Sequence, residues 1–229
     1  MPCTSAVDDG WTKGRAMSDT VGSSSAVGET TSPRAMEILD NATGLFDAHG
    51  YANVGMRAIA DAIGIRPASL YHHFDSKEAI LYAISLHVTK QFVADMEAVI
   101  DPSGDPQIVL KQMLHRQIVS SWDNRAAIEV TRRDMRELEP EHLTEVLFHR
   151  ARYRKILQSH IERGIAAGDF FHINPKLASL AILSLVNGVN DWFRDEGLVR
   201  DSSRTKMTIS DVADQYAEMI VDGLLARRH

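Results

Sequence analysis

The segment 56–78 constrains the fold of this 229-residue chain more than any other part of its sequence. Its first half carries apolar residues at the spacing of one helical stripe: Met56, Ile59, Ala60 and Ile63. Gly64 then predicts the end of this helix, because glycine tolerates the left-handed conformation that helix C-caps often adopt. We therefore expect a short helix at about 55–63.

The second half of the segment predicts a tight turn and a second short helix. Pro67 suits a first helical turn, because its missing N–H would have no partner there. Leu70 and Phe74 would anchor a helix at about 67–73 against a core. A helix, a glycine turn and a short helix form the helix-turn-helix pattern, whose second helix enters the DNA major groove.

Residues 59–78 closely resemble the DNA-binding domain of the tetracycline-repressor (TetR) family, and the resemblance covers about 32–87. It implies an all-α fold, with an N-terminal three-helix helix-turn-helix DNA-binding domain and a larger C-terminal helical domain for ligand binding and dimerisation. The sequence departs from the family pattern at Val54 and Gly55, where the family often has two hydroxyl residues. The residues that the resemblance places at the DNA are Arg57, Arg66, Pro67, Ala68, Ser69, Tyr71, His72 and Lys77.

Several of these residue types suit contacts with double-stranded DNA. An arginine such as Arg66 can place two donors on a guanine or a phosphate, although a solvated role is equally open for Arg66 and His72. Tyr71 offers a hydroxyl to the DNA backbone, and Ser69 is short enough to reach a base edge or a phosphate. Lys77, at the start of the next expected helix, is placed to bind a phosphate.

The net charge of −6 is unusual for a protein that binds nucleic acid. Between residues 33 and 90, five basic side chains stand against six acidic ones, which leaves a local net charge of −1. DNA affinity would therefore depend on where the charges lie rather than on their sum. Few phosphate contacts predict a modest dependence of that affinity on salt.

Composition favours a cytoplasmic protein with a substantial core. The chain is 44% hydrophobic and 24% charged, which suits one or two globular domains. Its one cysteine, Cys3, excludes a disulfide within one chain and fits a reducing compartment. The apolar runs predict neither a membrane span nor a signal peptide. His72 and His73 would diverge by about 100° on a helix, so we expect no metal site and no other cofactor.

The chain divides into a polar tail and two helical regions. Residues 1–31 lack a helical period and predict a disordered tail; an arm that reaches DNA and a misplaced start codon, with Met17 as the true start, are the alternatives. Residues 32–77 would form the helix-turn-helix domain, and residues 78–229 the ligand-binding and dimerisation domain. A long helix at about 76–100 would link the two mechanically.

The remaining helices follow from apolar periodicity and from breaks in it. The long helix begins at a capping residue, Asp75 or Ser76, and Glu78 stands where a capping box requires it. A turn rich in Pro and Gly at 101–106 marks its end, and the charged run 132–137 predicts a solvated helix face. The other expected helices lie at about 33–49, 105–121, 124–138, 140–167, 175–196 and 210–227.

The last two helices predict a homodimer interface. The helix at 178–193 is apolar on most sides, and a helix that is apolar all round must be buried all round. A ligand cavity on one side and a partner subunit on the other would meet this requirement. The resembled family forms its dimer from the last two helices of each subunit, although packing within one chain is the alternative. A dimer suits the reading of two half-sites in a palindromic operator.

A set of large apolar residues with a few polar groups describes a ligand pocket, and it describes a core equally well. The candidate ligand-binding residues are Met113, Trp122, Met135, Phe148, Arg152, Asn187, Asn190, Asp191, Trp192 and Phe193. The polar run 187–191 inside an apolar helix is the stronger indication, because buried amides need partners. The arrangement resembles that of family members that respond to fatty-acyl or steroid-derived CoA thioesters.

We therefore expect a DNA-binding transcriptional regulator that is not an enzyme. It would act as a repressor, released from a palindromic operator when a small lipophilic effector, such as an acyl-CoA, a fatty acid or a steroid-derived CoA thioester, tilts the long helix. An architectural or scaffold DNA-binding protein without a ligand is the alternative. An all-α enzyme is less favoured, because no motif has the spacing of a nucleophile and its base.

Overall fold

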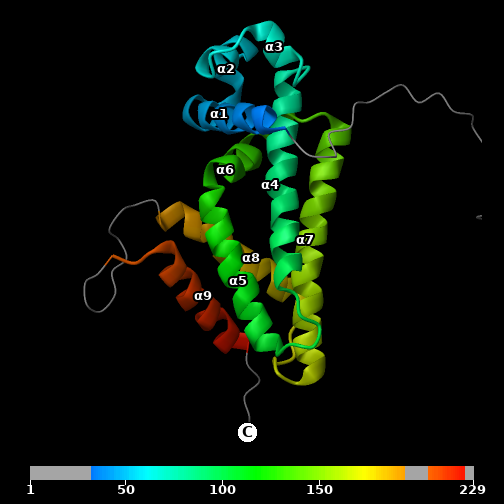
Figure 1. Cartoon of the computed structure of the whole chain (residues 1–229). Helices are drawn as coiled ribbons and strands as arrows, with labels where there is room; N and C mark the ends of the chain where they lie inside the picture. The colour runs from blue at the N-terminus through cyan, green and yellow to red at the C-terminus, as the bar shows by residue number, and fades with distance from the viewer. Residues whose placement is uncertain (1–31, 194–205, 225–229) are drawn as a thin grey trace, which may run out of the picture. The chain divides into compact units, whose positions relative to one another are not determined.

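The computed structural model describes residues 32–193 and 206–224, and it confirms the expected all-α fold (Figure 1). The elements are α1 (Pro33–His49), the 3₁₀ helix η1 (Tyr51–Asn53), α2 (Met56–Ala62), α3 (Pro67–Tyr71), α4 (Lys77–Val99), α5 (Pro106–Asp123), α6 (Arg125–Asp134), the 3₁₀ helix η2 (Met135–Glu137), α7 (Pro140–Ala167), α8 (Pro175–Phe193) and α9 (Ile209–Leu224). The expected tail at 1–31 lies outside the described residues, as do the ends of the helices expected at 175–196 and 210–227.

Local sequence explains where the first helices begin and end. The Ser32 hydroxyl caps α1 by accepting a hydrogen bond from the Ala35 N–H at 3.2 Å, and Pro33 occupies the first turn. Gly50 and Gly64 follow α1 and α2 at φ values of 81° and 67°, a region that L side chains rarely adopt. The helix end that the sequence assigned to Gly64 is therefore confirmed, and Gly50 ends the helix that was expected at 33–49.

The recognition helix is shorter than the sequence predicted. α3 ends at Tyr71, whereas the apolar spacing predicted a helix to His73. The Leu70 carbonyl accepts hydrogen bonds from the N–H groups of both His73 and Phe74, at 2.9 and 3.0 Å, and so tightens the last turn. The pattern placed the anchors correctly, because Leu70 and Phe74 are both buried.

The helix expected at 124–138 is also shorter than predicted. α6 ends at Asp134, and the chain continues as the tighter 3₁₀ helix η2. Glu139 then adopts an extended conformation with ψ of 149°, as a residue before a proline prefers, and Pro140 opens α7. The gap between α6 and α7 is therefore longer than apolar periodicity alone predicted.

The start of α4 confirms one half of the expected capping and contradicts the other. The Ser76 hydroxyl accepts a hydrogen bond from the Ala79 N–H at 2.9 Å, so Ser76 is the N-cap. Glu78 does not complete a capping box. Its carboxylate accepts hydrogen bonds from the Glu139 N–H at 3.0 Å and from His142 at 2.9 Å. A partner from α7 thus replaces the local one.

The described residues bury two hydrophobic cores. The first belongs to the helix-turn-helix head and contains Phe46, Ile59 and Leu70, all fully buried. Residues from α6 and from the start of α7, among them Val130 and Val146, close its lower side. The second core lies between α5, α7, α8 and α9. The core of the head therefore depends on side chains far along the chain. The domain boundary expected at residue 77 stays a prediction.

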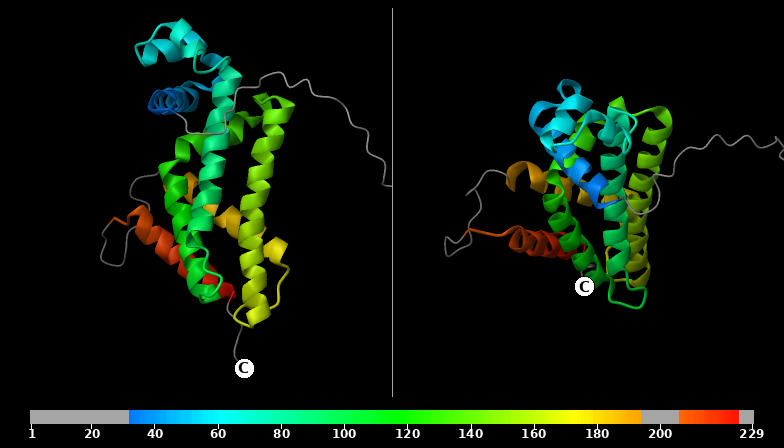
Figure 2. Two further views of the ribbon diagram at one scale, coloured as in Figure 1. Left: turned by 45° about the vertical axis from the view of Figure 1, so that its right-hand side comes forward. Right: turned by 45° about the horizontal axis from the view of Figure 1, so that its top comes forward.

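The long helix α4 connects the two cores. Its residues 80–86 are buried without a break, because α1, α5, α6 and α7 all pack against it. The apolar periodicity that predicted this helix does not by itself predict burial on all of its sides. α4 and α7 lie side by side in both views of Figure 2. At the lower end, buried Asp95 ties α4 to α5 through hydrogen bonds from Arg116 at 2.9 Å and Ser120 at 2.6 Å.

Candidate DNA-binding surface and ligand cavity

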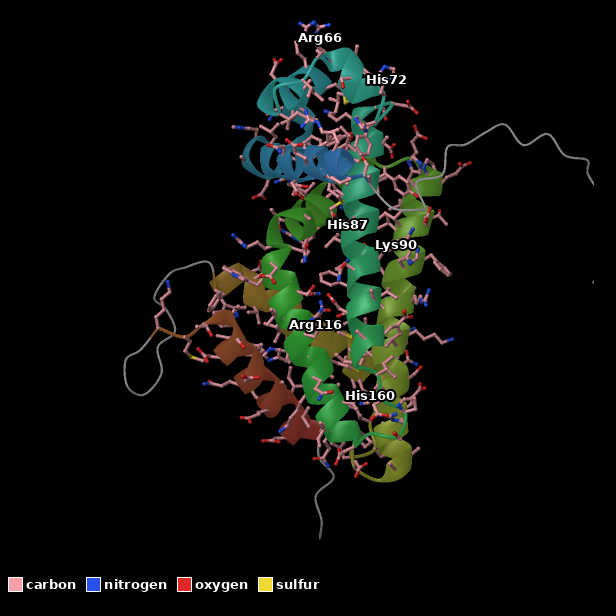
Figure 3. The ribbon with its side chains drawn as sticks, viewed as in Figure 1. Arg66, His72, His87, Lys90, Arg116 and His160 are labelled. Atoms are coloured by element: carbon pink, nitrogen blue, oxygen red, sulfur yellow. The ribbon has the colours of Figure 1, made fainter. Side chains whose placement is uncertain are left out.

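The short helix α3 presents the candidate DNA-binding side chains at one end of the head. Leu70 holds α3 against the core, while its neighbour Tyr71 is 50% exposed. Arg66 precedes α3 and points away from the ribbon, and His72 lies beside the end of α3 (Figure 3). Ser69 is partly exposed. These side chains share a surface that a major groove can receive.

The basic side chains of the head differ in how they are engaged. Arg57 and Arg66 are exposed and have no ion-pair partner within the described ranges. Arg34, by contrast, forms an ion pair with Glu37 on the same helix. Arg57 and Arg66 are therefore the arginines of the head most available to a phosphate or a guanine.

Lys77 has a structural role that the sequence did not indicate. Its ammonium donates a hydrogen bond to the Tyr51 carbonyl at 2.8 Å and lies 4.1 Å from the centre of the Tyr51 ring. An ammonium carries three donors, so binding a phosphate remains compatible with this contact. Lys77 thus fixes the loop after α1 and can serve DNA binding in addition.

The small residues of the recognition surface leave room for close approach. Pro67 opens α3 and is partly exposed, and Ala68 is exposed. Exposed carboxylates are also present in the head: Asp61 stands four positions after Arg57 on α2, and Asp75 follows α3.

A cavity of about 520 Å³ opens between α4, α5, α6, α7 and α8. Side chains that line it include buried Val88 and Thr89 of α4 and partly buried Tyr153 of α7. Burial raises the pKa of Tyr153 above its ordinary value. A volume of this size suits a small organic ligand.

Four arginines line the same cavity where it meets the surface: Arg125, Arg132, Arg150 and Arg154. Arg132 forms an ion pair with Glu129 at 2.8 Å, whereas Arg154 has no partner within the described residues. Arg125 lies over the Trp122 ring, 4.6 Å from its centre. The mouth of the cavity therefore carries an excess of positive charge that suits an anionic group.

Two buried amide side chains are among the residues that line the cavity. Asn190 and Gln117 are 8% and 2% exposed. Asn190 donates to the Ser121 carbonyl at 3.3 Å, and Gln117 donates to the Ser121 hydroxyl at 3.0 Å. The amide oxygens of both residues have no hydrogen-bond partner. Most buried polar atoms in proteins are paired, so these two unpaired acceptors are unusual.

The structure brings together some of the ligand-binding candidates. Asn187, Asn190 and Asp191 line the cavity, as the polar run of the sequence suggested. Phe148 and Arg152 instead line a second, more open groove of about 600 Å³ on the outer side of α7. The three α8 candidates therefore line the cavity, and the two α7 candidates line the outer groove.

The other candidates lie beside the cavity or away from it. Met113 is fully buried in the second core, and Met135 packs against the head core. Trp122 and Trp192 both contact Phe193, at ring-centre distances of 4.8 and 6.0 Å. Sequence reasoning missed Gln117, Tyr153 and the four arginines. The solvated face predicted for the charged run 132–137 is confirmed, because Arg132 is exposed and pairs with Glu129 three residues earlier, and Arg132 lines the cavity in addition.

α6 contacts both the cavity and the head. Arg132 lines the cavity mouth, and its neighbour Arg133 donates a hydrogen bond to the Phe46 carbonyl at the end of α1, at 2.7 Å. Arg133 is held in place by Asp134 at 2.8 Å. A shift of α6 would therefore reach the DNA-binding head directly, in addition to any movement of α4.

No group of three or more His, Cys, Asp or Glu side chains in the described part of the chain is arranged to hold a metal ion. Within 32–193 and 206–224, no helix is both long and apolar enough to cross a membrane.

The fold and its exposed helix-turn-helix define the protein as a DNA-binding regulator with a second helical domain. The family model described as bacterial regulatory proteins, tetR family, matches residues 38–84. The model described as tetracyclin repressor-like, C-terminal domain, matches residues 103–224, which is more than half of the chain. The chain belongs to the TetR family of transcriptional regulators, as the sequence resemblance predicted.

Individual relatives agree with this assignment. The HTH-type transcriptional repressor KstR2 of Rhodococcus jostii is 27% identical over 195 residues, which cover 84% of this chain and 92% of the relative. The structure of PfmR from Thermus thermophilus has 31% identity and a TM-score of 0.74, and it covers 86% of this chain and 100% of its own. AibR, solved with isovaleryl coenzyme A and operator DNA, shares the fold with a TM-score of 0.68 at 20% identity, over 80% of this chain and 96% of AibR.

Proposed function

We propose that this protein is a repressor that leaves its operator when an anionic, lipophilic effector enters the cavity between α4 and α8. The observation that carries the proposal is the cavity itself, which combines an arginine-lined mouth with a partly apolar interior. An acyl-CoA, a fatty acid or a steroid-derived CoA thioester has this combination of groups. We place its action in the cytoplasm, where operator DNA is accessible.

The DNA-binding part of the proposal rests on the exposed surface of α3. Arg57 and Arg66 supply free guanidinium groups, and Tyr71 supplies an exposed hydroxyl. Pro67, Ala68, Ser69, His72 and Lys77 complete the proposed contact surface. Guanidinium groups can bind guanine or phosphate, and the hydroxyl of Tyr71 can bind a phosphate oxygen.

We propose further that the protein is a homodimer through α8 and α9. The exposed large apolar side chains of these helices are Leu177, Leu180, Leu185 and Met219. A monomer rarely leaves such a group of leucines in water, so a second copy of the same surface is the occupant that explains it. A two-fold axis would set two α3 helices about 34–36 Å apart, one turn of DNA.

The arginines of the mouth support an acidic effector. Free Arg154 can bind a phosphate or a carboxylate without breaking an existing ion pair, and Arg132 can exchange Glu129 for such a group. Two relatives agree with this class, because AibR was solved with isovaleryl coenzyme A and KstR2 of Mycobacterium tuberculosis is described as a ketosteroid transcriptional regulator. The acidic group would lie at the mouth and the lipophilic part inside.

Release would follow from movement of α6 together with α4. A ligand that draws Arg132 toward its acidic group moves α6, and Arg133 carries this movement to the Phe46 carbonyl of α1. Val88 and Thr89 of α4 line the same cavity, so the ligand also acts on the helix that leads into the head. To change occupancy from 1:99 to 99:1, the ligand must prefer the released state by about 5.5 kcal/mol.

The alternatives are less well supported. A scaffold protein without a ligand does not account for an open cavity with unpaired buried amides. For an enzyme, the hydroxyls of Thr89, Thr131 and Ser184 in the cavity are the obvious nucleophiles. Each donates instead to the carbonyl four residues earlier in its own helix, at 2.6, 2.7 and 2.9 Å. None of these three hydroxyls is paired with a base.

Fluorescence anisotropy of the full chain on its own upstream DNA tests the proposal. Dodecanoic acid and dodecanoyl-CoA should release the DNA in a saturable way, whereas dodecanol, which lacks the acidic group, should not. Release by dodecanol alone would contradict the role of the arginines. Binding that no compound releases would support the ligand-free alternative, and absence of DNA binding at modest salt would contradict the regulator.

A further inference from the structure

The groove on the outer side of α7 has no part in the effector mechanism proposed above. It measures about 600 Å³ and is lined by Ile100, just after α4, and by residues of α7 from Phe148 to Arg163. Much of this lining is apolar, and the side chains of Phe148 and Ile100 are 64% and 39% exposed. Large apolar side chains exposed around a hollow often mark a binding site.

Three cations line the groove, and none of its lining residues carries a carboxylate. Arg152 forms an ion pair with Glu97 at 2.6 Å, and Arg163 donates a hydrogen bond to the Asp101 carbonyl at 2.8 Å. Lys155 is exposed and has no ion-pair or hydrogen-bond partner within the described residues. Lys155 is therefore the cation that an anionic ligand can bind without breaking an existing contact.

The buried side chain of His160 adds no charge to the lining. Its Nε2 lies 2.8 Å from the Pro106 carbonyl, which can only accept, so Nε2 carries a proton. Its Nδ1 lies 3.4 Å from the guanidinium of Arg163, which can only donate, so Nδ1 is an acceptor. The imidazole is therefore neutral, and burial favours this form by lowering its pKa. The groove thus combines an apolar lining with one available ammonium.

The apolar lining and the free ammonium lie on the same side of α7. Phe148 and Lys155 are seven positions apart, which is nearly two helical turns and about 10 Å along the helix axis. Ala151 lines the groove between them, and its methyl group fills little of the space. An alkyl chain that begins at Lys155 can therefore lie over Ala151 and reach the ring of Phe148.

We propose that this groove binds a fatty acid, with the carboxylate on Lys155 and the alkyl chain over Ala151 and Phe148. The site is separate from the effector cavity, which other residues of α7 line, among them Tyr153 and Arg154. A second copy of the same surface would bring the cations of both copies together, so charge favours an anionic ligand over self-association. The inference does not depend on the function proposed above.

Calorimetric titration of the full chain without DNA tests the ligand class. The ligands are octanoic, decanoic and dodecanoic acid, each below the concentration at which it forms micelles, and dodecanol. We expect affinity to rise at least tenfold from octanoic to dodecanoic acid, because more alkyl surface leaves water. Dodecanol should bind at least ten times more weakly than dodecanoic acid. Affinity that depends on neither the chain nor the carboxylate would overturn the inference.

Two exposed substitutions locate the site. Phe148→Ser and Lys155→Gln should each lower the dodecanoic acid bound per chain by about one equivalent, at a concentration that just saturates the unchanged protein. Leu147→Ser is the matched control for Phe148→Ser, because Leu147 is the exposed neighbour on α7 and lies outside the groove lining. Lys111→Gln on α5 is the control for the lysine. The same amount bound by all four variants would overturn the inference.

A membrane surface is the other source of the same chemistry, and vesicles of phosphatidylglycerol distinguish it. Sedimentation with vesicles that requires Phe148 and Lys155, without binding of free dodecanoic acid, would overturn the inference.

Operator release by dodecanoyl-CoA is measured separately, so that the two proposals fail separately. Groove binding in a protein whose operator no compound releases supports the inference and contradicts the proposed function. Release without a bound equivalent that depends on Phe148 and Lys155 supports the function and overturns the inference. Release that is lost in Phe148→Ser and Lys155→Gln would make the groove the effector site and overturn the assignment of two separate sites.

Discussion

The head and the helical body of this protein are packed in different ways. The head core encloses large side chains such as Phe46 and Leu70 without exposure to solvent. The body also buries side chains such as Met113 completely, but it contains in addition a cavity of about 520 Å³ whose lining includes two amides with unpaired oxygens. A close-packed core moves as a unit, whereas a partly open one can rearrange when a ligand fills it. The difference fits a rigid DNA reader attached to a responsive sensor.

The largest expected effect comes from opening the sealed core. Leu70→Ala should destabilise the protein by about 2–5 kcal/mol, because the fully buried side chain leaves a cavity. Leu183→Ala, which borders the existing cavity, should cost less than half as much. Urea denaturation measures both, and Ile108→Ala at an exposed position should stay within about 0.5 kcal/mol of the parent. Equal losses in head and body would remove the contrast between the two regions.

The second effect concerns the leucines that the body exposes. Leu185→Asp should weaken the dimer by at least about 2 kcal/mol, because a charge would enter the apolar interface in both subunits. Analytical ultracentrifugation should show a shift toward monomer, together with weaker operator binding. Ile108→Asp introduces the same charge at a similarly exposed apolar position outside α8 and α9. A dimer unaffected by Leu185→Asp would show that the body exposes this surface for another reason.

A third test concerns the charge at the cavity mouth. Arg154→Gln should raise the effector concentration needed for half-release about tenfold, because a charged hydrogen bond contributes roughly 1.5–3 kcal/mol. Affinity for DNA without effector should not change. Lys155→Gln is the matched control, since Lys155 lines the outer groove of α7 instead. If only Lys155→Gln reduced the response to the effector, the effector site would lie in that groove instead.

A smaller effect is expected at the junction of the two regions. Arg133→Met removes the hydrogen bond to the Phe46 carbonyl and should lower the coupling between effector and DNA by about 0.5–2 kcal/mol. Effector binding without DNA, measured by calorimetry, should stay unchanged. Arg136→Met, an exposed change in η2, serves as the control. Full coupling in Arg133→Met would assign the transmission to α4.

The smallest effect should come from the reading surface. Tyr71→Phe should weaken operator binding by about 0.5–1.5 kcal/mol, because it removes one hydroxyl from an exposed ring. Binding should weaken without loss of thermal stability. Arg66→Gln should weaken operator binding as well, and it should also reduce the dependence of that binding on salt if Arg66 binds a phosphate. Unchanged affinity in both variants would remove these residues from the proposed DNA contact.

The two regions also differ in how far the sequence predicted them. In the head, Gly50, Gly64 and Pro67 stand close to one another in the chain and act on their own backbone, so helix ends and the turn could be predicted. In the body, Asn190 and Gln117 lie 73 positions apart and meet only in the folded chain. The arginines of the mouth come from two helices and carry no local signature. The polar run on α8 did indicate the cavity, because amides within an apolar helix are unusual and can be recognised from one helix alone.

The sequence by itself determined the all-α fold, the helix-turn-helix and the family, because these depend on periodicity, capping and turn residues a few positions apart. Tertiary structure decided which polar groups stay unpaired, where the cavity lies and how the head is closed. Glu78 shows the physical reason, because its carboxylate left a local capping role for two donors from the start of α7. Packing decides which hydrogen-bond partner such a side chain meets, because it brings together residues that no local sequence pattern connects.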